Sequence, residues 1–158
     1  MSNDEAVRKA WQTNLDVNLE LVRHLTPEML SAQTPGGGFS VAQHLAHIVA
    51  SVKYWGMALE KGAFAGLADL YDPDAEEFVA ENDREKIETV LKETYECARA
   101  AAERHPRGSA ELPHADASAF LLHMMVHDAH HRGQVLLALK VSGHPLPAEQ
   151  ALWAPWRE

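Results

Sequence analysis

The sequence predicts an all-α protein folded as a four-helix bundle. Apolar residues recur at three- and four-residue steps along four long segments, which is the spacing of one face of an α-helix. No alternating run of Val, Ile, Thr and Tyr is flanked by an Asn-Gly or Asp-Gly turn, so the usual signal of a β-hairpin is missing. The 158 residues are the length of one domain. We therefore expect a single helical domain over residues 1–158.

The first helix is expected to begin after a cap at Asn3 or Asp4 and to end near His24, before Thr26. Its inward face repeats every three or four residues and carries Val7, Trp11, Leu15, Asn18, Leu19 and Val22. The Thr-Pro-Glu sequence that follows is a helix-start signal and predicts one short turn of helix. The glycine-rich loop 35–38 comes after that turn.

The second long helix is expected to begin at Ser40, because a cap serine with Gln43 three positions later matches a capping box. It runs to about Glu60, before Gly62. The segment 62–82 that follows is a long connection, in which the acidic residues are Asp69, Asp72, Asp74, Glu76 and Glu77. A connection of that length can cross the end of the bundle, whereas a tight hairpin would be short.

The third helix is expected to start at the cap Asp83 and to end at His105, before a proline. One of its faces carries Ile87, Leu91, Tyr95 and Ala98. The fourth helix is expected to run from about Asp116 to Val141, where a Ser-Gly pair stops it. Four long helices with apolar faces and no internal repeat are typical of a four-helix bundle.

Composition narrows the range of partners and locations. A formal net charge of −9, with 14 scattered Lys and Arg residues, argues against nucleic acid as a partner. The longest apolar runs are far shorter than the roughly 20 residues of a membrane span, so no membrane partner is expected. The N-terminus is acidic where a secretory signal would be basic, which predicts a cytoplasmic protein. The single Cys97 excludes an intrachain disulfide and is expected to be a packed residue.

Four histidines lie within nine residues of the last helix, in the stretch HMMVHDAHHRGQV (123–135). At about 100° per residue, His123, His127 and His130 lie within about 60° of one another, and His131 lies about 40° from His127. A buried imidazole needs a partner for its ring nitrogens, so a cluster of imidazoles indicates a shared partner. His127 and His131 are one turn apart and can point both rings at one metal ion.

A metal held by two residues of one helix needs a third ligand, and the helix that starts at Ser40 offers His44 and His47. The residue pattern alone leaves the choice between these two open. His123 and His130 are expected to flank the site or to face solvent, and His44 likewise if it is not the ligand. The other histidines are expected at the surface, at helix ends or in loops: His24, His105, His114 and His144.

Two phrases of the sequence resemble the DinB/YfiT-like superfamily. FSVAQHLAHIVASVKYW is similar to the second helix of that superfamily, and HDAHHRGQV is similar to the HxxxHRGQ phrase of its last bundle helix. A Leu-Thr-Pro-Glu turn and a closing Leu-Pro-Ala-Glu segment extend the resemblance over most of the chain. The resemblance implies an up-up-down-down four-helix bundle, frequently dimeric, with His47, His127 and His131 as the metal ligands.

Three protein ligands leave one or more positions open on a divalent ion, as in catalytic rather than closed structural sites. An ion such as zinc or nickel would lower the pKa of a water or a thiol that it binds. The resemblance implies a thiol S-transferase, which would use a low-molecular-weight thiol such as bacillithiol or mycothiol as cosubstrate, or a metal-dependent hydrolase. In either case a small molecule is the expected substrate.

No catalytic residue can be assigned from the sequence, because no HExxH arrangement supplies a general base and no serine nucleophile motif is present. Two alternatives therefore stay open. One is a non-catalytic bundle that binds a metal or another ligand, and the other is a structural bundle whose histidines are solvated. Turnover would exclude the first, and a bound metal would exclude the second.

Some expectations concern packing alone. Gly133 costs about 1 kcal/mol in mid-helix relative to alanine, which predicts a close approach of two helices there. Arg132 is expected to form a salt bridge to another helix. Core or tail packing is expected of the tryptophans, which are Trp11, Trp55, Trp153 and Trp156. A homodimer contact, or a cap on the bundle of the same chain, is expected of the apolar tail residues Leu152, Trp153 and Trp156.

Overall fold

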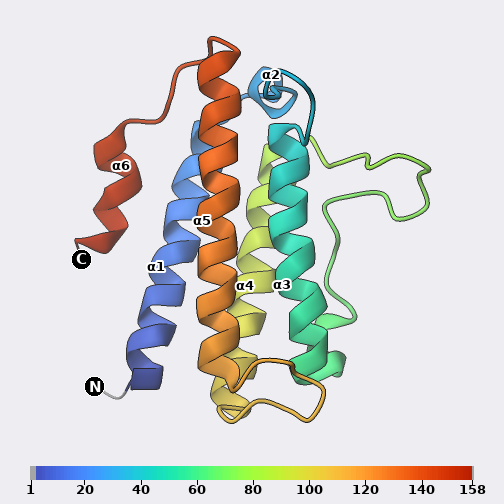
Figure 1. The fold of residues 1–158 in the computed structure, drawn as a ribbon, viewed down its shortest axis with the longest axis vertical. Coiled ribbons are helices and arrows are strands. Elements are labelled where there is room, and N and C mark those ends of the chain that lie inside the picture. The colour runs from blue at the N-terminus through green and yellow to red at the C-terminus, as the bar shows by residue number, and fades with distance from the viewer. Residues whose placement is uncertain (1–2, 158) are drawn as a thin grey trace.

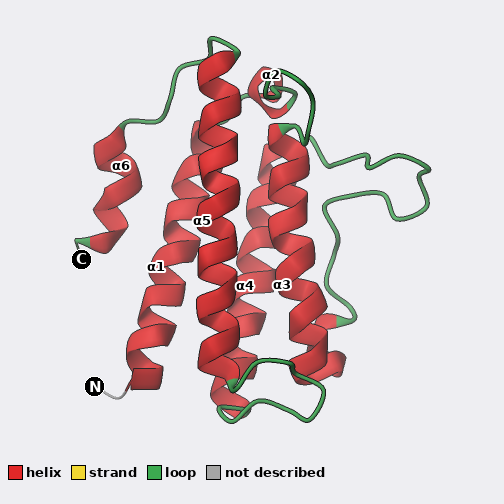
Figure 2. Cartoon of the chain, in the orientation of Figure 1, coloured by secondary structure: helices red, strands yellow, loops and turns green. Residues whose placement is uncertain are grey.

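The structure is a computed structural model that describes residues 3–157, and its regular elements are helices (Figures 1 and 2). The long helices are α1 (Asn3–His24), α3 (Val41–Phe64), α4 (Arg84–Arg104) and α5 (Ala117–Val141). The short ones are α2 (Pro27–Leu30), α6 (Glu149–Trp153) and the 3-10 helix η1 (Ala154–Trp156). Within residues 3–157 there is no strand, only an isolated antiparallel bridge between Tyr71 and Ala80. The all-α prediction is confirmed.

The four long helices of the described chain pack side by side as a bundle. α3 packs against α4 and α5, and α1 packs against the same two helices. α1 and α5 run in one direction and α3 and α4 in the other (Figure 1). Two helices therefore point each way, and their order along the chain is up, down, down, up, which differs from the up-up-down-down order that the resemblance implies (Figure 1). The long connection after α3 returns to the opposite end of the bundle, so α3 and α4 are parallel (Figure 1).

The long helices that follow Ser40, Asp83 and Asp116 start where the sequence predicts, and local hydrogen bonds cap their first turns. Ser40 Oγ accepts from the backbone N–H of Gln43 at 3.2 Å, and Gln43 Oε1 accepts from the backbone N–H of Ser40 at 2.8 Å. This is the predicted capping box. The carboxylates of Asp83 and Asp116 accept backbone N–H groups in the first turns of α4 and α5. At Glu60, the predicted end of α3, the backbone leaves helical geometry (φ −152°, ψ 80°) before one further turn.

The last turn of α3 folds back over the helix, and a glycine makes room for it. Phe64 is fully buried, and a Cβ at Gly56 would overlap its ring. Only a residue without a side chain lets the ring lie this close to the helix backbone. Gly56 therefore has a packing role.

The connection between α3 and α4 is tied to α3 by polar contacts and one buried side chain. Lys53 Nζ donates to the carbonyl of Leu67 at 2.7 Å and to Asp69 Oδ2 at 2.8 Å. Gln43 Nε2 donates to the carbonyl of Phe78 at 2.6 Å. Leu70 is buried in the core. The acidic segment therefore lies along the side of α3 that faces away from α1.

Aromatic packing joins α1 to α4 in the core. Trp11 and Tyr95 are buried, their rings stack with centroids 4.5 Å apart, and Trp11 Nε1 donates to the carbonyl of Tyr95 at 2.9 Å. In the tail, Leu152 packs against the core, while Trp153 and Trp156 remain about half exposed, at 51% and 50%. The tail contacts α1 of its own chain. The homodimer stays a prediction.

Two packing predictions for α5 are wrong. Gly133 is exposed, and a Cβ built there would meet no atom within 4 Å, because its face of α5 turns away from the other described helices. Arg132 does contact another helix, but its partners are neutral. Its Nη1 donates to the amide oxygens of Asn14 and Asn18 on α1, both at 2.7 Å.

None of the described helices is both long and apolar enough to span a membrane.

Cys97 is half-buried, and its thiol donates to the carbonyl of Ala63 at 3.5 Å. Burial raises the pKa of this thiol, so it stays protonated at neutral pH. Both findings agree with a packed, unreactive cysteine.

Candidate metal centre

The three histidines implied as metal ligands meet between α3 and α5. His47 projects from α3, and His127 and His131 project from α5, one turn apart. One ring nitrogen of each lies within 4.8 Å of the other two. The i, i+4 spacing places two rings on one face of α5, and the packing of α3 on α5 adds the third.

The spacing of the ring nitrogens fits a bound cation. Nε2 of His131 and Nε2 of His127 are 3.1 Å apart. Two ligand atoms at about 2.0–2.1 Å from a zinc ion lie about 3.3 Å apart at the tetrahedral angle, and about 3.0 Å apart at the right angle of an octahedral site. The ring of His47 lies against both partners, with centroids 5.1 Å from that of His127 and 4.8 Å from that of His131. The donor set therefore suits a divalent ion such as zinc or nickel.

The environment favours the neutral form of His131 and His47. Burial is the main cause, and the neighbouring histidines add to it, so that the pKa of His131 falls to about 3. Burial and then His127 lower the pKa of His47 in the same way. A cation binds the neutral form of imidazole, so the ring lone pairs are available near neutral pH without the loss of a proton.

His44 is a buried partner of the cluster: of the two alternatives expected for it, it flanks the site and does not face solvent. Its side chain is 8% exposed, and its Nδ1 lies 2.8 Å from Nδ1 of His131. His131 turns its Nε2 toward His127, so its Nδ1 is the nitrogen left to donate to His44. The second nitrogen of a metal-binding histidine is commonly fixed in this way. His44 thus sets the orientation of His131, and His47 is the histidine of α3 that joins His127 and His131 in the cluster.

On its other side, α5 carries a buried polar network that sequence reasoning missed. Asp128 is fully buried, and its Oδ2 accepts from Asn14 Nδ2 at 2.6 Å, Asn18 Nδ2 at 3.2 Å and Tyr95 Oη at 2.5 Å. Burial, and then the charge of Asp128, raise the pKa of Tyr95 well above its usual value, so the phenol remains a donor. The missed signal is the pair of amides one turn apart on the inward face of α1.

The chain is similar to known proteins in its sequence and in its fold. The model of the DinB family matches residues 1–158. This chain belongs to the DinB family. Among solved structures, the crystal structure of a DinB-like protein from Bacillus cereus ATCC 10987 is similar, with a TM-score of 0.64 and 18% identity over 91% of this chain and 95% of that chain. That likeness supports the DinB-like fold of the bundle. No curated protein sequence matches the chain.

The remaining histidines of this DinB protein lie outside the cluster. His123 and His130 are exposed, as predicted. His114 is half-buried, and its Nε2 lies 2.9 Å from Nδ1 of His123, with both rings near Trp55. In the part of the chain that the structure describes, only the three-histidine cluster brings enough ligand atoms together to hold a metal.

One further polar side chain lies beside the cluster. Ser51 follows His47 by one turn of α3, and its Oγ is 3.5 Å from Nε2 of His127. The hydroxyl therefore lies next to the nitrogen that faces His131. Sequence reasoning did not select Ser51, although its i+4 spacing from His47 places it on the same face of α3.

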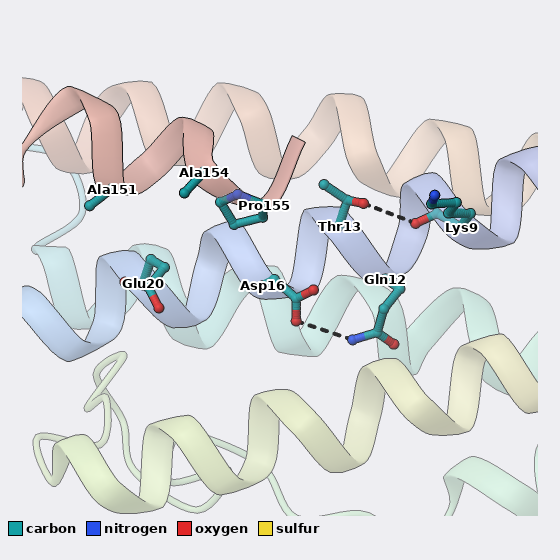
Figure 3. A pocket seen from close by; sticks show the side chains of 8 residues that line it. All are labelled: Lys9, Gln12, Thr13, Asp16, Glu20, Ala151, Ala154 and Pro155. Carbon is teal, nitrogen blue, oxygen red and sulfur yellow. Dashed lines mark hydrogen bonds between the residues drawn. The ribbon is translucent and has the colours of Figure 1, made fainter. Parts of the chain in front are cut away.

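A separate groove runs between α1 and the tail of the DinB chain (Figure 3). Its volume is about 600 Å³, and it is lined by Lys9, Gln12, Thr13, Asp16, Glu20, Ala151, Ala154 and Pro155. Gln12 Nε2 donates to Asp16 Oδ1, and Thr13 Oγ1 donates to the carbonyl of Lys9, both at 3.2 Å. These polar groups bond to one another along α1 instead of converging on a common point. The chemistry of the molecule is therefore concentrated at the histidine cluster.

Proposed function

We propose that this DinB protein is a metal-dependent enzyme of the thiol S-transferase type. His47, His127 and His131 would hold one zinc or nickel ion and leave positions open for a small-molecule substrate. The observation that carries the proposal is the convergence of three imidazole nitrogens within 4.8 Å of one another, two of them 3.1 Å apart, which is close to the spacing of two ligand atoms on one divalent ion. A hydrolase with the same metal ligands is the second candidate.

The side chains around the cluster favour thiol transfer over hydrolysis. When bound, the ion would act as a Lewis acid that lowers the pKa of a thiol or a water molecule beside it. The only group of metal-binding side chains that the described residues bring together consists of histidines and contains no carboxylate. Hydrolysis usually needs a general base to take a proton from the attacking water, whereas a low-molecular-weight thiol becomes a strong nucleophile once it has lost its proton.

A turnover screen tests the proposal. Untagged protein loaded with zinc or nickel would be assayed with several low-molecular-weight thiols and an electrophile, and separately with esters and amides. We expect thiol-dependent turnover that is lost in His47→Ala and retained in the control His123→Ala, one turn away from the cluster. Ester or amide cleavage without a thiol would favour the hydrolase. Stoichiometric metal with no turnover of any substrate would favour a non-catalytic metal-binding bundle.

We also propose that the chain forms a homodimer through the outer face of α5. The exposed residues Leu122, Val126, Leu137 and Val141 lie on this face, with the small residues Ala129 and Gly133 between them. The large residues are spaced symmetrically about the middle of the stripe, so two antiparallel copies would bring residue 122 next to 141 and residue 126 next to 137. Light scattering should show a dimer for the wild type and a monomer for Val126→Glu. A monomeric wild type would contradict the proposal.

A further inference from the structure

Two buried polar atoms without hydrogen-bond partners lie close together beneath the metal centre. One is Nδ1 of His127 and the other is Oδ1 of Asp128, and they are 3.9 Å apart. A buried carboxylate oxygen without a donor costs about 1–3 kcal/mol or more, so native proteins rarely leave one unsatisfied without a reason. Because a histidine nitrogen is the nearby unpartnered group, the reason lies in the state of that histidine.

The surrounding network fixes how the carboxylate of Asp128 is oriented. Arg132 can only donate, and its Nη1 bonds to the amide oxygens of Asn14 and Asn18. Both amides must therefore turn their NH₂ groups toward Asp128, where they meet Oδ2 together with the hydroxyl of Tyr95. Three donors on Oδ2 leave Oδ1 as the free oxygen, on the side of His127.

We propose that Asp128 is a positioning residue of the metal centre, whose Oδ1 accepts the Nδ1–H of His127 when Nε2 of that histidine binds the cation. The inference rests on the metal site of the proposed function and adds a residue to it. An imidazole that coordinates through Nε2 carries its proton on Nδ1, so metal binding turns His127 Nδ1 into the donor that Oδ1 lacks. The positive charge of the ion also offsets the buried negative charge of Asp128.

The two ligands on α5 are then held by different partners. His131 already has its partner, because its Nδ1 lies 2.8 Å from Nδ1 of the buried His44. His127 has the adjacent Asp128 on its own helix. Both arrangements assign the coordinating nitrogen as Nε2, which agrees with the 3.1 Å separation of the two Nε2 atoms.

The wild-type protein provides the first test and needs no substitution. Nitrogen-15 NMR of the zinc-loaded, full-length protein reports which nitrogen of each imidazole carries the proton. For His127 we expect a protonated Nδ1 whose proton resonates downfield, as in a strong hydrogen bond to a carboxylate. A zinc-bound Nδ1, or an Nδ1–H with the shift of a solvated imidazole, would overturn the proposal.

Substitution provides the second test, with zinc affinity and stability measured separately. In Asp128→Asn the amide oxygen must take the position of Oδ2, because three donors point at that position. The amide NH₂ group would then face the Nδ1–H of His127, and two hydrogen-bond donors would face each other. We expect zinc affinity, measured by competition with a chelating dye, to fall about 10–100-fold. The matched control is Tyr95→Phe, which removes a donor from Oδ2, leaves Oδ1 in place and should change zinc affinity less than about threefold.

The outcomes separate this inference from the metal site on which it rests. If the wild type binds zinc and Asp128→Asn binds it equally well, the positioning role is wrong and the metal site stands. If Tyr95→Phe loses as much affinity as Asp128→Asn, the effect comes from general distortion of the core, which also overturns the inference. A wild type that binds no divalent ion would overturn both. Should Asp128→Asn fail to fold, the wild-type NMR spectrum still decides.

Discussion

Two polar interfaces lie on adjacent sides of α5, and they differ in how their polar atoms are satisfied. In the histidine interface, toward α3, His127 and His131 face His47 and place ring nitrogens together. In the amide interface, toward α1, Asp128 and Arg132 meet the side chains of Asn14 and Asn18. The residues of the two interfaces are neighbours in sequence, so the same turns of α5 contribute side chains to both interfaces.

This difference indicates that the amide interface holds the fold together and that the histidine interface is the candidate binding site. In the amide interface donors match acceptors, except at the single oxygen Oδ1 of Asp128. A closed network of this kind holds two helices in one register. In the histidine interface ring nitrogens face one another, and only a shared proton or a cation can satisfy their lone pairs. The polar groups of the amide interface, which are hydrogen-bonded to one another, stabilise the bundle. The nitrogens of the histidine interface have lone pairs without donors and are therefore suited to bind a ligand.

The largest expected effect comes from removing one ring of the histidine interface. His127→Ala should lower zinc affinity at least about 100-fold, because a direct ligand is worth more than an outer partner. The matched control His123→Ala, one turn earlier on α5, should bind zinc as the wild type does. Isothermal titration with untagged protein measures both. Equal losses in the two variants would remove the distinction between the cluster and the other histidines.

Acid should weaken the metal-free protein through the histidine interface. The pKa of His131 is about 3 in the folded chain and about 6.5 when unfolded, so the unfolded chain takes up a proton that the folded chain excludes. The stability that this group gives above about pH 6.5 is lost as the pH falls toward 3. At pH 5 the loss is about 2 kcal/mol.

Urea unfolding in the presence of a chelator, between pH 7.5 and 5, measures this loss. His131→Leu should flatten the profile, because the unfolded variant no longer gains that proton. A wild-type free energy of unfolding that stays constant over this range would contradict the burial of a neutral imidazole.

A substitution in the amide interface should change the free energy of unfolding and leave zinc affinity nearly unchanged. Asn18→Leu removes one donor from Asp128 and one acceptor from Arg132, and should lower the free energy of unfolding by about 2 kcal/mol. Zinc affinity should change less than about threefold, because the histidines keep their contacts. Urea unfolding and zinc titration of the same sample measure the two quantities. A large loss of zinc affinity with unchanged stability would reverse the roles of the two interfaces.

The smallest expected effect concerns the uncovered face of α5. In the monomeric background Val126→Glu, Gly133→Ala places a methyl group in open space and should raise the free energy of unfolding by about 1 kcal/mol, with zinc affinity unchanged. The same substitution at Gly56 should destabilise the protein, because the methyl group overlaps Phe64. Thermal unfolding of the two variants should therefore move in opposite directions. A destabilised Gly133→Ala in that monomeric background would contradict the open space found beside Gly133.

Local signals account for the parts of the fold that sequence reasoning predicts. Ser40 and Asp83 cap the helices they are expected to cap, and Asp116 caps the helix expected to begin near it, because a cap depends on residues within three positions. The positions of His47, His127 and His131 follow from helix periodicity together with the resemblance to the DinB/YfiT-like superfamily. The caps depend on residues close together in the sequence, and the histidine positions depend on a family motif.

The parts that sequence reasoning missed depend on contacts between distant segments. Nothing near His44 in the sequence shows that its ring meets His131, 87 residues away. The bond from Asn14 to Asp128 spans 114 residues. The prediction for Gly133 failed for the same reason, because helix periodicity shows which residues share a face but not which face lacks a neighbour. Long-range packing therefore decides the partners of the clustered histidines.

In the proposed function, three imidazoles hold one cation and leave room for another ligand. X-ray absorption spectroscopy of zinc-loaded, untagged protein at one ion per chain tests it most directly. We predict three imidazole nitrogens at about 2.0–2.1 Å, completed by at least one light atom that an added thiol replaces with sulfur at about 2.3 Å. Four protein ligands with no change on adding thiol, or fewer than three imidazoles, would contradict the account.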